Sequence, residues 1–478
     1  MKIAFVQETV NQNIGIEYLS AILKSKGHEC ELFIEPLEND LSSAIKSFSP
    51  DIIGFGVITG AHQWVMEKAM YFKKILPRSL VIIGGPHPTY FPEMINEPGV
   101  DVIARGEAEI SFLELVTRIS DSRDYSDVQG FWLKINGNIY RNDPAPLVED
   151  VSSLPFPDHA LYLKYAFFKD QTEVPFIMTR GCPFNCSFCY NHVKMTLYRS
   201  KGRYLRTRSV EHVISEMELA RKLYPNMRSV IMHDDTIGLD EKWLADFSRE
   251  YRRRINMPWF ISIRADFTDE FTVEQLRLAN CFCLSVGVET GDEYLREKIL
   301  GKKIPDSSYI RASELIHKAG IKLRTSNMLF LPEEDIDKAM KTVDLNRKMK
   351  VDFPWAYTLQ PYPGTAIYDY ALKNGYIPEG FHFDDIDPLG LVKPIIKTKD
   401  QNKIMVLHRL FYLSVKNGFI RRLLRGLVLI PPNFLFEGLY YFSLIQSYAE
   451  YHQVSFLRAF KVALSNFKGL KKPVKVKH

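Results

Sequence analysis

The sequence predicts an α/β protein of three parts: an N-terminal doubly wound parallel sheet, a central partial (β/α)6 barrel and a helical C-terminal segment. Three observations predict this arrangement. Short apolar runs alternate with amphipathic helical stretches over most of the chain, as in parallel sheets whose strands are buried on both faces. A proline-rich passage divides the alternation into two blocks. From Gln401 onward the pattern is helical.

Length and composition indicate a globular chain of more than one domain. At 478 residues it exceeds one ordinary domain, and 46% apolar and 25% charged residues are typical of soluble globular proteins. The net charge of +5 is spread along the chain, so no nucleic-acid partner is expected. The opening apolar run is too short for a signal peptide, and three of the six cysteines are clustered, which argues against a disulfide framework. We therefore expect a cytoplasmic protein.

The first block, residues 1–145, predicts the doubly wound sheet. Its expected strands are Lys2–Val6, Glu29–Ile34, Asp51–Val57, Leu80–Ile83 and Asp101–Ile103, and its expected helices are Ile16–Lys26, Leu41–Phe48 and Trp64–Ile75. Such sheets bind ligands outside the carboxyl ends of their strands. Glycines gather at those ends: Gly54, Gly56, Gly60, Gly84, Gly85 and Gly106. They would allow the backbone to approach a bulky ligand, or they form only tight turns; both interpretations stay open.

The second block, residues 171–385, predicts the barrel and follows a linker over residues 146–170. The prolines of Asp143–Pro146 and Leu154–Pro157 continue neither a helix nor a central strand. The expected strands are Val174–Thr179, Ser229–His233, Trp259–Ile263, Cys283–Val288, Lys322–Phe330 and Trp355–Gln360. Six βα units suggest a barrel that is open on one side, with its site at the carboxyl ends of the strands.

A cysteine loop directly follows the first of these strands. Cys182, Cys186 and Cys189 are spaced CxxxCxxC, so one loop can direct three thiolates at one centre, and thiolates hold iron-sulfur clusters. Structural zinc usually takes four ligands, and a second cysteine pair is missing here. Three cysteines on a 4Fe-4S cluster leave one iron open to a small molecule. The alternative is three buried structural cysteines.

This segment resembles the radical S-adenosylmethionine (SAM) enzymes, which have CxxxCxxC after a strand and an aromatic residue, here Phe188, before the third cysteine. The preceding domain, with its Ile-Gly-Gly-Pro-His and Arg-Gly-Glu runs, makes residues 1 to about 370 similar to the cobalamin-dependent radical SAM family. The resemblance implies a 4Fe-4S cluster, SAM and cobalamin as cofactors. It also implies Cys182, Cys186 and Cys189 as the cluster ligands and catalytic residues.

The resemblance further implies residues that hold SAM at the ends of the barrel strands. It assigns Asp234 and Asp235 to the amino-acid end, Arg264 to the carboxylate, Glu289 to the ribose and the Tyr190 backbone to the adenine, with Phe188 and Asn327 also binding cofactor. Acidic side chains suit an ammonium group and a ribose, and arginine suits a carboxylate. The family often has Gly-Gly-Glu where this chain has His233-Asp234-Asp235.

For cobalamin, the resemblance implies Gln12, Thr59, Gly60, Gly84, Gly85, Pro86, His87, Gly106 and Glu107 as binding residues. Other cobalamin domains ligate cobalt through the histidine of a DxHxxG motif. Aligning Gly15 with the glycine of that motif places Val10 and Gln12 at the aspartate and histidine positions. We therefore expect no histidine that ligates cobalt from below. A domain that has lost cobalamin binding would show the same absence. His62 and His87 each stand alone in a loop and are not expected to bind metal.

The remaining cysteines are expected in the core. Cys281 and Cys283 begin the fourth barrel strand, where alternation places both on one face. An auxiliary cluster is the less favoured interpretation because cysteine is commonly buried. Cys30, in an N-terminal strand, is interpreted in the same way.

The C-terminal segment, residues 386–478, combines apolar and aromatic residues with arginine. Its charge-free stretches 426–436 and 438–449 are too short to span a bilayer. After Glu450 there are seven Lys or Arg and no acidic residue. The segment is expected to cover the open side of the barrel; a peripheral contact with an anionic membrane is the alternative.

Taken together, these features predict a cobalamin-dependent radical SAM methyltransferase. It would cleave SAM reductively and transfer a methyl group through methylcobalamin to a small natural-product, pigment or lipid-like substrate, with an electron donor such as flavodoxin or ferredoxin. Two alternatives stay open: an enzyme with the same cofactors that cyclises, rearranges or oxidises its substrate, and a non-catalytic cobalamin or iron-sulfur binding or sensory protein.

Overall fold

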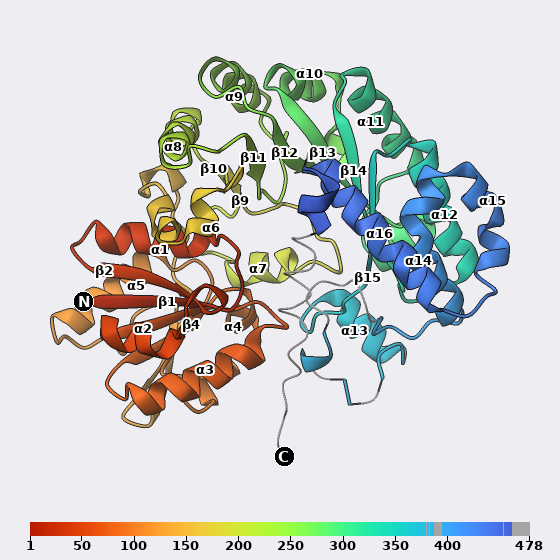
Figure 1. Cartoon of the computed structure of the whole chain (residues 1–478). Helices are drawn as coiled ribbons and strands as arrows, with labels where there is room; N and C mark the ends of the chain where they lie inside the picture. The colour runs from red at the N-terminus through yellow and green to blue at the C-terminus, as the bar shows by residue number, and fades with distance from the viewer. Residues whose placement is uncertain (379, 382, 387–393, 453, 461–478) are drawn as a thin grey trace.

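The computed structural model describes residues 1–378, 380–381, 383–386, 394–452 and 454–460. Figure 1 shows two sheets side by side, the N-terminal one in red and orange and the barrel in green and teal, with the blue C-terminal helices beside the barrel. The predicted fold class is confirmed in both sheets.

The N-terminal sheet has seven strands in the order β2-β1-β3-β4-β5-β6-β7. Its first five strands are parallel: β1 Lys2–Gln7, β2 Glu29–Ile34, β3 Ile52–Gly56, β4 Leu80–Gly84 and β5 Val102–Ala104. The helices are α1 Ile14–Lys24, α2 Leu41–Phe48, α3 His62–Ile75, α4 Pro86–Tyr90 and α5 Glu109–Ser120, with 3₁₀ helices at Glu35–Leu37 and Pro92–Asn96. One apolar cluster joins α1 and α5 to one face, and another joins α2 and α3 to the opposite face. The sheet is therefore doubly wound.

A hairpin that the sequence analysis missed extends this sheet. β6 Phe131–Ile135 pairs antiparallel with β5 and with β7 Asn138–Arg141. The two residues of its turn, Asn136 and Gly137, have φ angles of +51° and +82°, as a two-residue hairpin turn requires. The sheet is thus mixed at one edge.

The barrel is a six-stranded sheet of parallel strands in the order β15-β14-β13-β12-β11-β8. The strands are β8 Glu173–Phe176, β11 Ser229–Met232, β12 Trp259–Ile263, β13 Cys281–Glu289, β14 Lys322–Leu329 and β15 Phe353–Thr358. The helices are α8 Val210–Leu223, α9 Glu241–Arg254, α10 Glu270–Leu278, α11 Asp306–Lys318, α12 Ile336–Lys348 and α13 Ala366–Lys373. Short elements are α7 Asn191–Leu197, a π-helical turn at Leu295–Ile299, 3₁₀ helices at Ala265–Phe267 and Phe383–Asp385, and the strand pair β9 Thr179–Arg180 and β10 Arg206–Thr207.

The cysteines of β13 are buried as expected but not on one face. Cys281 belongs to the main barrel core, whereas Cys283 contacts the separate cluster of Phe260, Phe353 and Tyr451. Trp259 pairs with Cys281 and the next residue, Phe260, pairs with Cys283, so β13 has one extra residue at this point. Such a bulge turns the following side chains to the other face, and the one-face prediction was wrong for this reason. Cys30 is buried in the N-terminal core, as expected.

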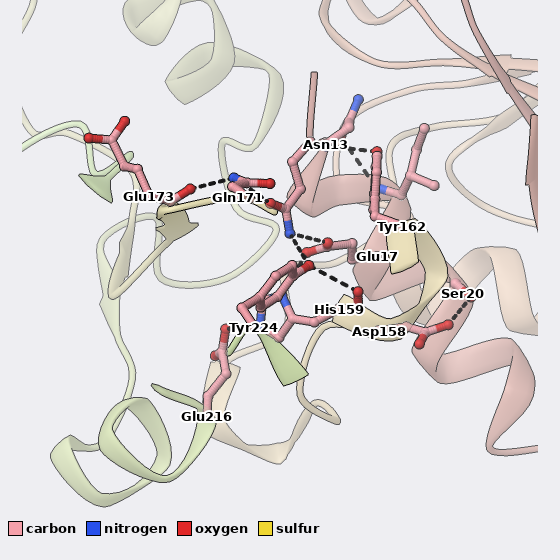
Figure 2. A network of polar contacts seen from close by, with 12 residues as sticks. Asn13, Glu17, Ser20, Asp158, His159, Tyr162, Gln171, Glu173, Glu216 and Tyr224 are labelled. Carbon is pink, nitrogen blue, oxygen red and sulfur yellow. Dashed lines mark hydrogen bonds and ion pairs between the residues drawn. The ribbon is translucent and has the colours of Figure 1, made fainter. Parts of the chain in front are cut away.

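The passage between the two sheets is packed rather than extended. It contains 3₁₀ helices at Val151–Ser153 and His159–Lys164 and α6 Ala166–Lys169. Leu161, Tyr162 and Phe168 pack into the apolar core of the N-terminal sheet. Figure 2 shows His159 of this passage between Glu17 of α1 and Glu216 of α8. A polar network therefore joins the two sheets through the passage.

The C-terminal helices cover the barrel near its edge strand. They are α14 Gln401–Lys416, α15 Gly418–Leu427 and α16 Phe434–Tyr451. The ring of His408 on α14 is 3.0 Å from the carbonyl oxygen of Ala356 in β15, and Tyr451 packs on Phe260 of β12 at a ring distance of 4.9 Å. This agrees with the expected cover of the barrel. Among the residues described, we find no helix long and apolar enough to cross a bilayer.

Candidate active site

A cavity of about 430 Å³ lies between the two sheets. Five predicted cobalamin residues line it from the carboxyl ends of β4 and β5: Gly84, Gly85, Pro86, Gly106 and Glu107. The barrel contributes Arg180, Gly181, Lys194, His233 and Asp235. Ile58 also lines the cavity and is 54% exposed, an apolar surface that a bulky ligand would cover. The carboxyl ends of both sheets therefore face one common space, which suits a large cofactor.

Two of the cavity glycines are required by the fold itself. Gly85 has a φ of +101°, and a Cβ there would lie 2.9 Å from the backbone nitrogen and oxygen of Val57. A Cβ on Gly106 would lie 1.9 Å from the hydroxyl of Tyr198. The tight-turn interpretation therefore holds for these two glycines, and the same residues line the cavity.

Four other predicted cobalamin residues do not line this cavity. The Gln12 amide donates to the Glu17 carboxylate at 2.6 Å and lies 3.2 Å from the Tyr224 hydroxyl, within the network between the sheets. Thr59 and Gly60 belong to the loop after β3, where the Thr59 hydroxyl is 2.9 Å from Nδ1 of His87.

His62 and His87 do not stand alone, contrary to expectation. Their rings stack with centroids 4.5 Å apart, and Nε2 of His62 is 2.7 Å from the Asp384 carboxylate. Burial, with a further contribution from His62, lowers the pKa of His87 to about 3. His87 is therefore uncharged at neutral pH.

The cysteine loop is fixed by its neighbours at the edge of the same space. The Ser187 backbone donates to the Leu300 carbonyl at 3.0 Å, and the Asn191 amide donates to the carbonyls of Cys182 and Phe184. Gly181 has a φ of +88°, and a Cβ there would lie 2.5 Å from the Tyr204 carbonyl oxygen. These contacts fix the backbone of the loop against its neighbours.

All three loop cysteines are free thiols, with Cys189 exposed and the other two partly exposed. The surrounding chain reduces the hydration of each thiolate and thereby raises the pKa of each thiol, that of Cys189 to about 11 although this residue reaches the surface. The other two loop thiols contribute to the raised pKa of Cys189. Within the described ranges, no three His, Cys, Asp or Glu side chains gather as closely as a single metal ion requires. A 4Fe-4S cluster separates its ligating sulfurs by several atoms, so the loop's chemistry fits a cluster.

The two aspartates after β11 have different surroundings. Asp234 is buried and accepts hydrogen bonds from the backbone of Met178 at 3.0 Å and from the hydroxyl of Thr179 at 2.7 Å. Burial raises the pKa of Asp234 to about 6. Asp235, in contrast, lines the cavity, and burial raises its pKa as well. Asp234 thus fixes the start of the cysteine loop, while Asp235 is placed to meet a ligand.

Arg264 and Glu289 flank the cysteine loop from neighbouring strands. The Arg264 guanidinium lies 3.5 Å from the ring centroid of Phe184 in the loop and pairs with Asp266 at 2.8 Å. Glu289 has a φ of +67° and forms a buried ion pair with Lys302 at 2.9 Å. A non-glycine residue in this region is strained, and such strain clusters at functional sites.

The aromatic and amide residues predicted to bind SAM are spread around this region. The ring of Tyr190 stacks on Tyr90 of α4 with centroids 4.0 Å apart, so it bridges the two sheets. Phe188 packs against the apolar cluster of the C-terminal helices. Asn327 is fully buried and exchanges amide hydrogen bonds with Asn346 while donating to the Trp355 carbonyl at 2.8 Å.

The structure adds an ion cluster that sequence reasoning missed. Glu107 accepts from Arg206 at 2.6 Å and from Arg180 at 2.9 Å, and Arg180 also pairs with Glu109 at 2.6 Å. Burial alone would raise the pKa of Glu107, but these arginines and Lys194 outweigh it and lower the pKa to about 2. Glu107 was itself predicted to bind cobalamin, but the only cue to its arginine partners was the position of Arg180 directly before the cysteine loop.

Two family models match the chain: the B12 binding domain over residues 3–116 and the radical SAM superfamily over residues 176–345. An uncharacterized methyltransferase, PH0819, of Pyrococcus horikoshii is 28% identical and covers 88% of this chain and 94% of its own. An anaerobic magnesium-protoporphyrin IX monomethyl ester cyclase of Rubrivivax gelatinosus is 27% identical and covers 82% and 71%.

Solved structures share the fold. The cobalamin-dependent SAM radical enzyme OxsB, with aqua-cobalamin and SAM bound, matches with a TM-score of 0.71 and 17% identity over 94% of this chain and 72% of its own. The radical SAM methyltransferase TsrM of Kitasatospora setae matches with a TM-score of 0.66 and 17% identity over 79% and 77%. The order of the two family models, the shared fold and the cysteine loop beside a glycine-lined cavity agree. The chain belongs to the cobalamin-dependent radical SAM family, whose enzymes use a 4Fe-4S cluster, SAM and cobalamin.

Proposed function

We propose that this enzyme is a methyltransferase that acts on a small natural-product, pigment or lipid-like substrate. The main support is the cavity, in which the glycine-lined end of the cobalamin-binding sheet faces Gly181, at the start of the cysteine loop, and Asp235 of the barrel. Several relatives of similar sequence are named methyltransferases, among them a bacteriochlorophyllide d C-8(2)-methyltransferase of Chlorobaculum tepidum, 25% identical over 62% of this chain.

The proposed roles follow from the positions of the side chains. Cys182, Cys186 and Cys189 would hold the cluster. Asp235 and Arg264 would orient SAM by its ammonium and carboxylate groups, and Glu289 would orient it by its ribose. When bound, the cluster supplies the electron that cleaves SAM, and cobalamin carries the methyl group. Gln12 is hydrogen-bonded to Glu17 and Tyr224 outside the cavity, which supports cobalamin binding without the Gln12 side chain as a ligand. A flavodoxin or ferredoxin is the proposed electron donor.

A second candidate is cyclisation without methyl transfer. The observation that favours it is the Rubrivivax relative, a cyclase that is 27% identical over 82% of this chain. A cyclase and a methyltransferase can share the same cofactor sites, because substrate contacts rather than the fold decide the outcome.

The two candidates are distinguished by the fate of the SAM methyl group. The holoenzyme, purified without oxygen, is incubated with reductant, SAM labelled at its methyl group and an apolar extract of the source cells. We expect 5′-deoxyadenosine together with a labelled new product. Formation of 5′-deoxyadenosine with an unlabelled product would support cyclisation, and absence of 5′-deoxyadenosine would contradict both candidates.

Blocking the cavity is expected to prevent cobalamin binding. Ala108 lines the cavity, and the Ala108→Trp side chain would occupy space that the fold leaves empty. We expect cobalamin affinity, measured by titration of the corrin absorbance, to fall by at least about tenfold because a filled site rejects a bulky ligand. The matched control is Ala44→Trp, since Ala44 is also partly buried but packs in the cluster on the α2 side of the sheet. Equal affinity of the two variants would place cobalamin elsewhere.

A further inference from the structure

The turn between α15 and α16 exposes an unusual amount of apolar side chain. Leu429 is 71% exposed, Phe434 90% and Leu435 58%, and two prolines lie between them. Soluble proteins expose single apolar residues routinely, but a contiguous group of large ones marks an interaction surface. We call the residues 429–435 the apolar tip.

Helix α15 continues this surface. Phe419 and Leu423 are exposed and lie four residues apart, on one side of the helix, whereas Leu424 and Val428 are buried against the body of the protein. Figure 1 shows α15 and the adjoining part of α16 at the outer edge of the molecule, on the side opposite the N-terminal sheet. The helix therefore presents an apolar stripe to its outside.

Cations surround this apolar surface. The sequence from Gln401 to Phe436 contains no Asp or Glu. Arg422 is exposed, and Arg425 lies 3.6 Å from Asp337 with both side chains 73% exposed, which is a weak contact. Arg421 instead pairs with Asp344 at 2.7 Å, and Glu437 pairs with Arg409 at 2.6 Å. The acidic groups facing the helix are thus paired with arginines, and the outward charge is positive.

From these observations we propose that the apolar tip and the outer face of α15 dock on an anionic lipid bilayer. An amphipathic helix with arginines beside large apolar residues lies in the plane of the interface, with its apolar side chains about 5–10 Å deep. The arginines then remain at the level of the anionic headgroups. This surface lies outside the cofactor cavity, so the proposal does not depend on methyl transfer.

A lipid bilayer fits this surface better than a second copy of the chain. Arg422 and Arg425 adjoin the apolar stripe, and a layer of anionic headgroups would meet both of these positive charges. The sequence beyond residue 460 adds six lysines and no acidic residue, so the end of the sequence is basic as well. A self-interface would bring these like charges together across a two-fold axis.

The test is co-sedimentation of the full-length holoenzyme with vesicles of phosphatidylcholine alone or mixed with phosphatidylglycerol. We expect binding to the mixed vesicles to exceed binding to the neutral ones by at least about tenfold at low salt and to weaken at high salt. The double variant Phe434→Ser, Leu435→Ser should lose about tenfold or more in vesicle binding. Arg422→Gln, Arg425→Gln should lose the preference for anionic vesicles.

The matched control removes similar apolar area elsewhere. Phe167 and Ile110 are 60% and 53% exposed and belong to α6 and α5. Phe167→Ser, Ile110→Ser should bind vesicles like the unmodified protein. Equal vesicle binding by the tip variant, or no binding by the unmodified protein, would overturn the proposal. A dimer in solution that the tip variant converts to a monomer would instead identify a self-interface. SAM cleavage without substrate, measured in parallel, reports the cofactor site separately.

Discussion

Replacing Cys186 by serine is expected to remove the cluster and all SAM cleavage. The three loop cysteines are the only protein thiols that the spacing directs at one centre, and a serine hydroxyl is not deprotonated at neutral pH, so it is a poor iron ligand. Two remaining thiolates do not hold four irons. We expect iron to fall from about four per chain to below about one. We also expect no 5′-deoxyadenosine above the level without enzyme, measured by chromatography after anaerobic reconstitution.

Two buried thiols outside the loop provide matched controls. Cys30 and Cys283 are 7% and 1% exposed and pack in the cores of the two sheets. Their alanine variants should keep iron content and SAM cleavage, apart from a modest loss of stability from a small cavity. Cobalamin binding by Cys186→Ser should also persist, because the glycine-lined wall belongs to the other sheet. SAM cleavage by Cys186→Ser would contradict the assignment of this loop as the cluster site.

Local patterns in the sequence predicted most of the regular structure. The strand Glu29–Ile34 and the helix Leu41–Phe48 have the expected bounds, because a continuous apolar run and an amphipathic repeat are signals that neighbouring residues provide. The hairpin at Asn136-Gly137 was missed although that dipeptide is a recognised turn signal. The alternation of side chains along a strand wrongly predicted Cys281 and Cys283 on one face. The bulge between them depends on how β13 pairs with β12, which the sequence of β13 alone does not report.

The site was predictable only where the residues follow one another in the chain. The cysteine loop and the glycines at strand ends are local motifs, and five of the predicted cobalamin residues do line the cavity. The ion pair of Arg180 with Glu107 joins residues 73 positions apart, and no periodicity reports such a contact. Asp234 and Asp235 are adjacent in the sequence but have different surroundings in the fold. Asp234 accepts a hydrogen bond from the backbone before the cysteine loop, whereas Asp235 lines the cavity. Side-chain direction at a strand end is decided by packing.

The second large effect is expected from Glu216, which belongs to the buried network between the sheets (Figure 2). Its carboxylate contacts Arg208 and lies 3.1 Å from Nε2 of His159, whose Nδ1 is 3.4 Å from Glu17. Each of these side chains is at most 1% exposed. Glu216→Gln removes the carboxylate that pairs with Arg208 and leaves His159 with Glu17 alone, and breaking a buried ion pair in this way costs about 3–5 kcal/mol. We expect a clearly lower thermal midpoint, measured by circular dichroism.

The pH dependence of unfolding distinguishes a charged His159 from a merely well-packed one. Burial alone would lower the pKa of His159, but the carboxylates of Glu17 and Glu216 outweigh it and raise the pKa to about 10. A folded-state pKa above the ordinary 6.5 gives stability that is complete below pH 6.5 and is lost as the pH rises toward 10. The thermal midpoint should therefore fall as the pH rises over this range. The His159→Gln variant should have a lower midpoint at pH 6.5, and its midpoint should lack the part of the pH dependence that His159 causes.

The control for this titration is His28→Gln. Burial and the N-terminal ammonium group lower the pKa of His28, so its titration is displaced away from the alkaline range and its loss should leave the slope in that range unchanged. If His159→Gln kept the same slope as the unmodified protein, His159 would be neutral in the fold.

Because Glu17, His159 and Glu216 come from α1, the connecting passage and α8, a charged His159 also fixes how the cobalamin-binding sheet sits against the barrel. Loss of its charge should therefore weaken cobalamin binding at high pH in the unmodified protein, although none of the three side chains lines the cavity.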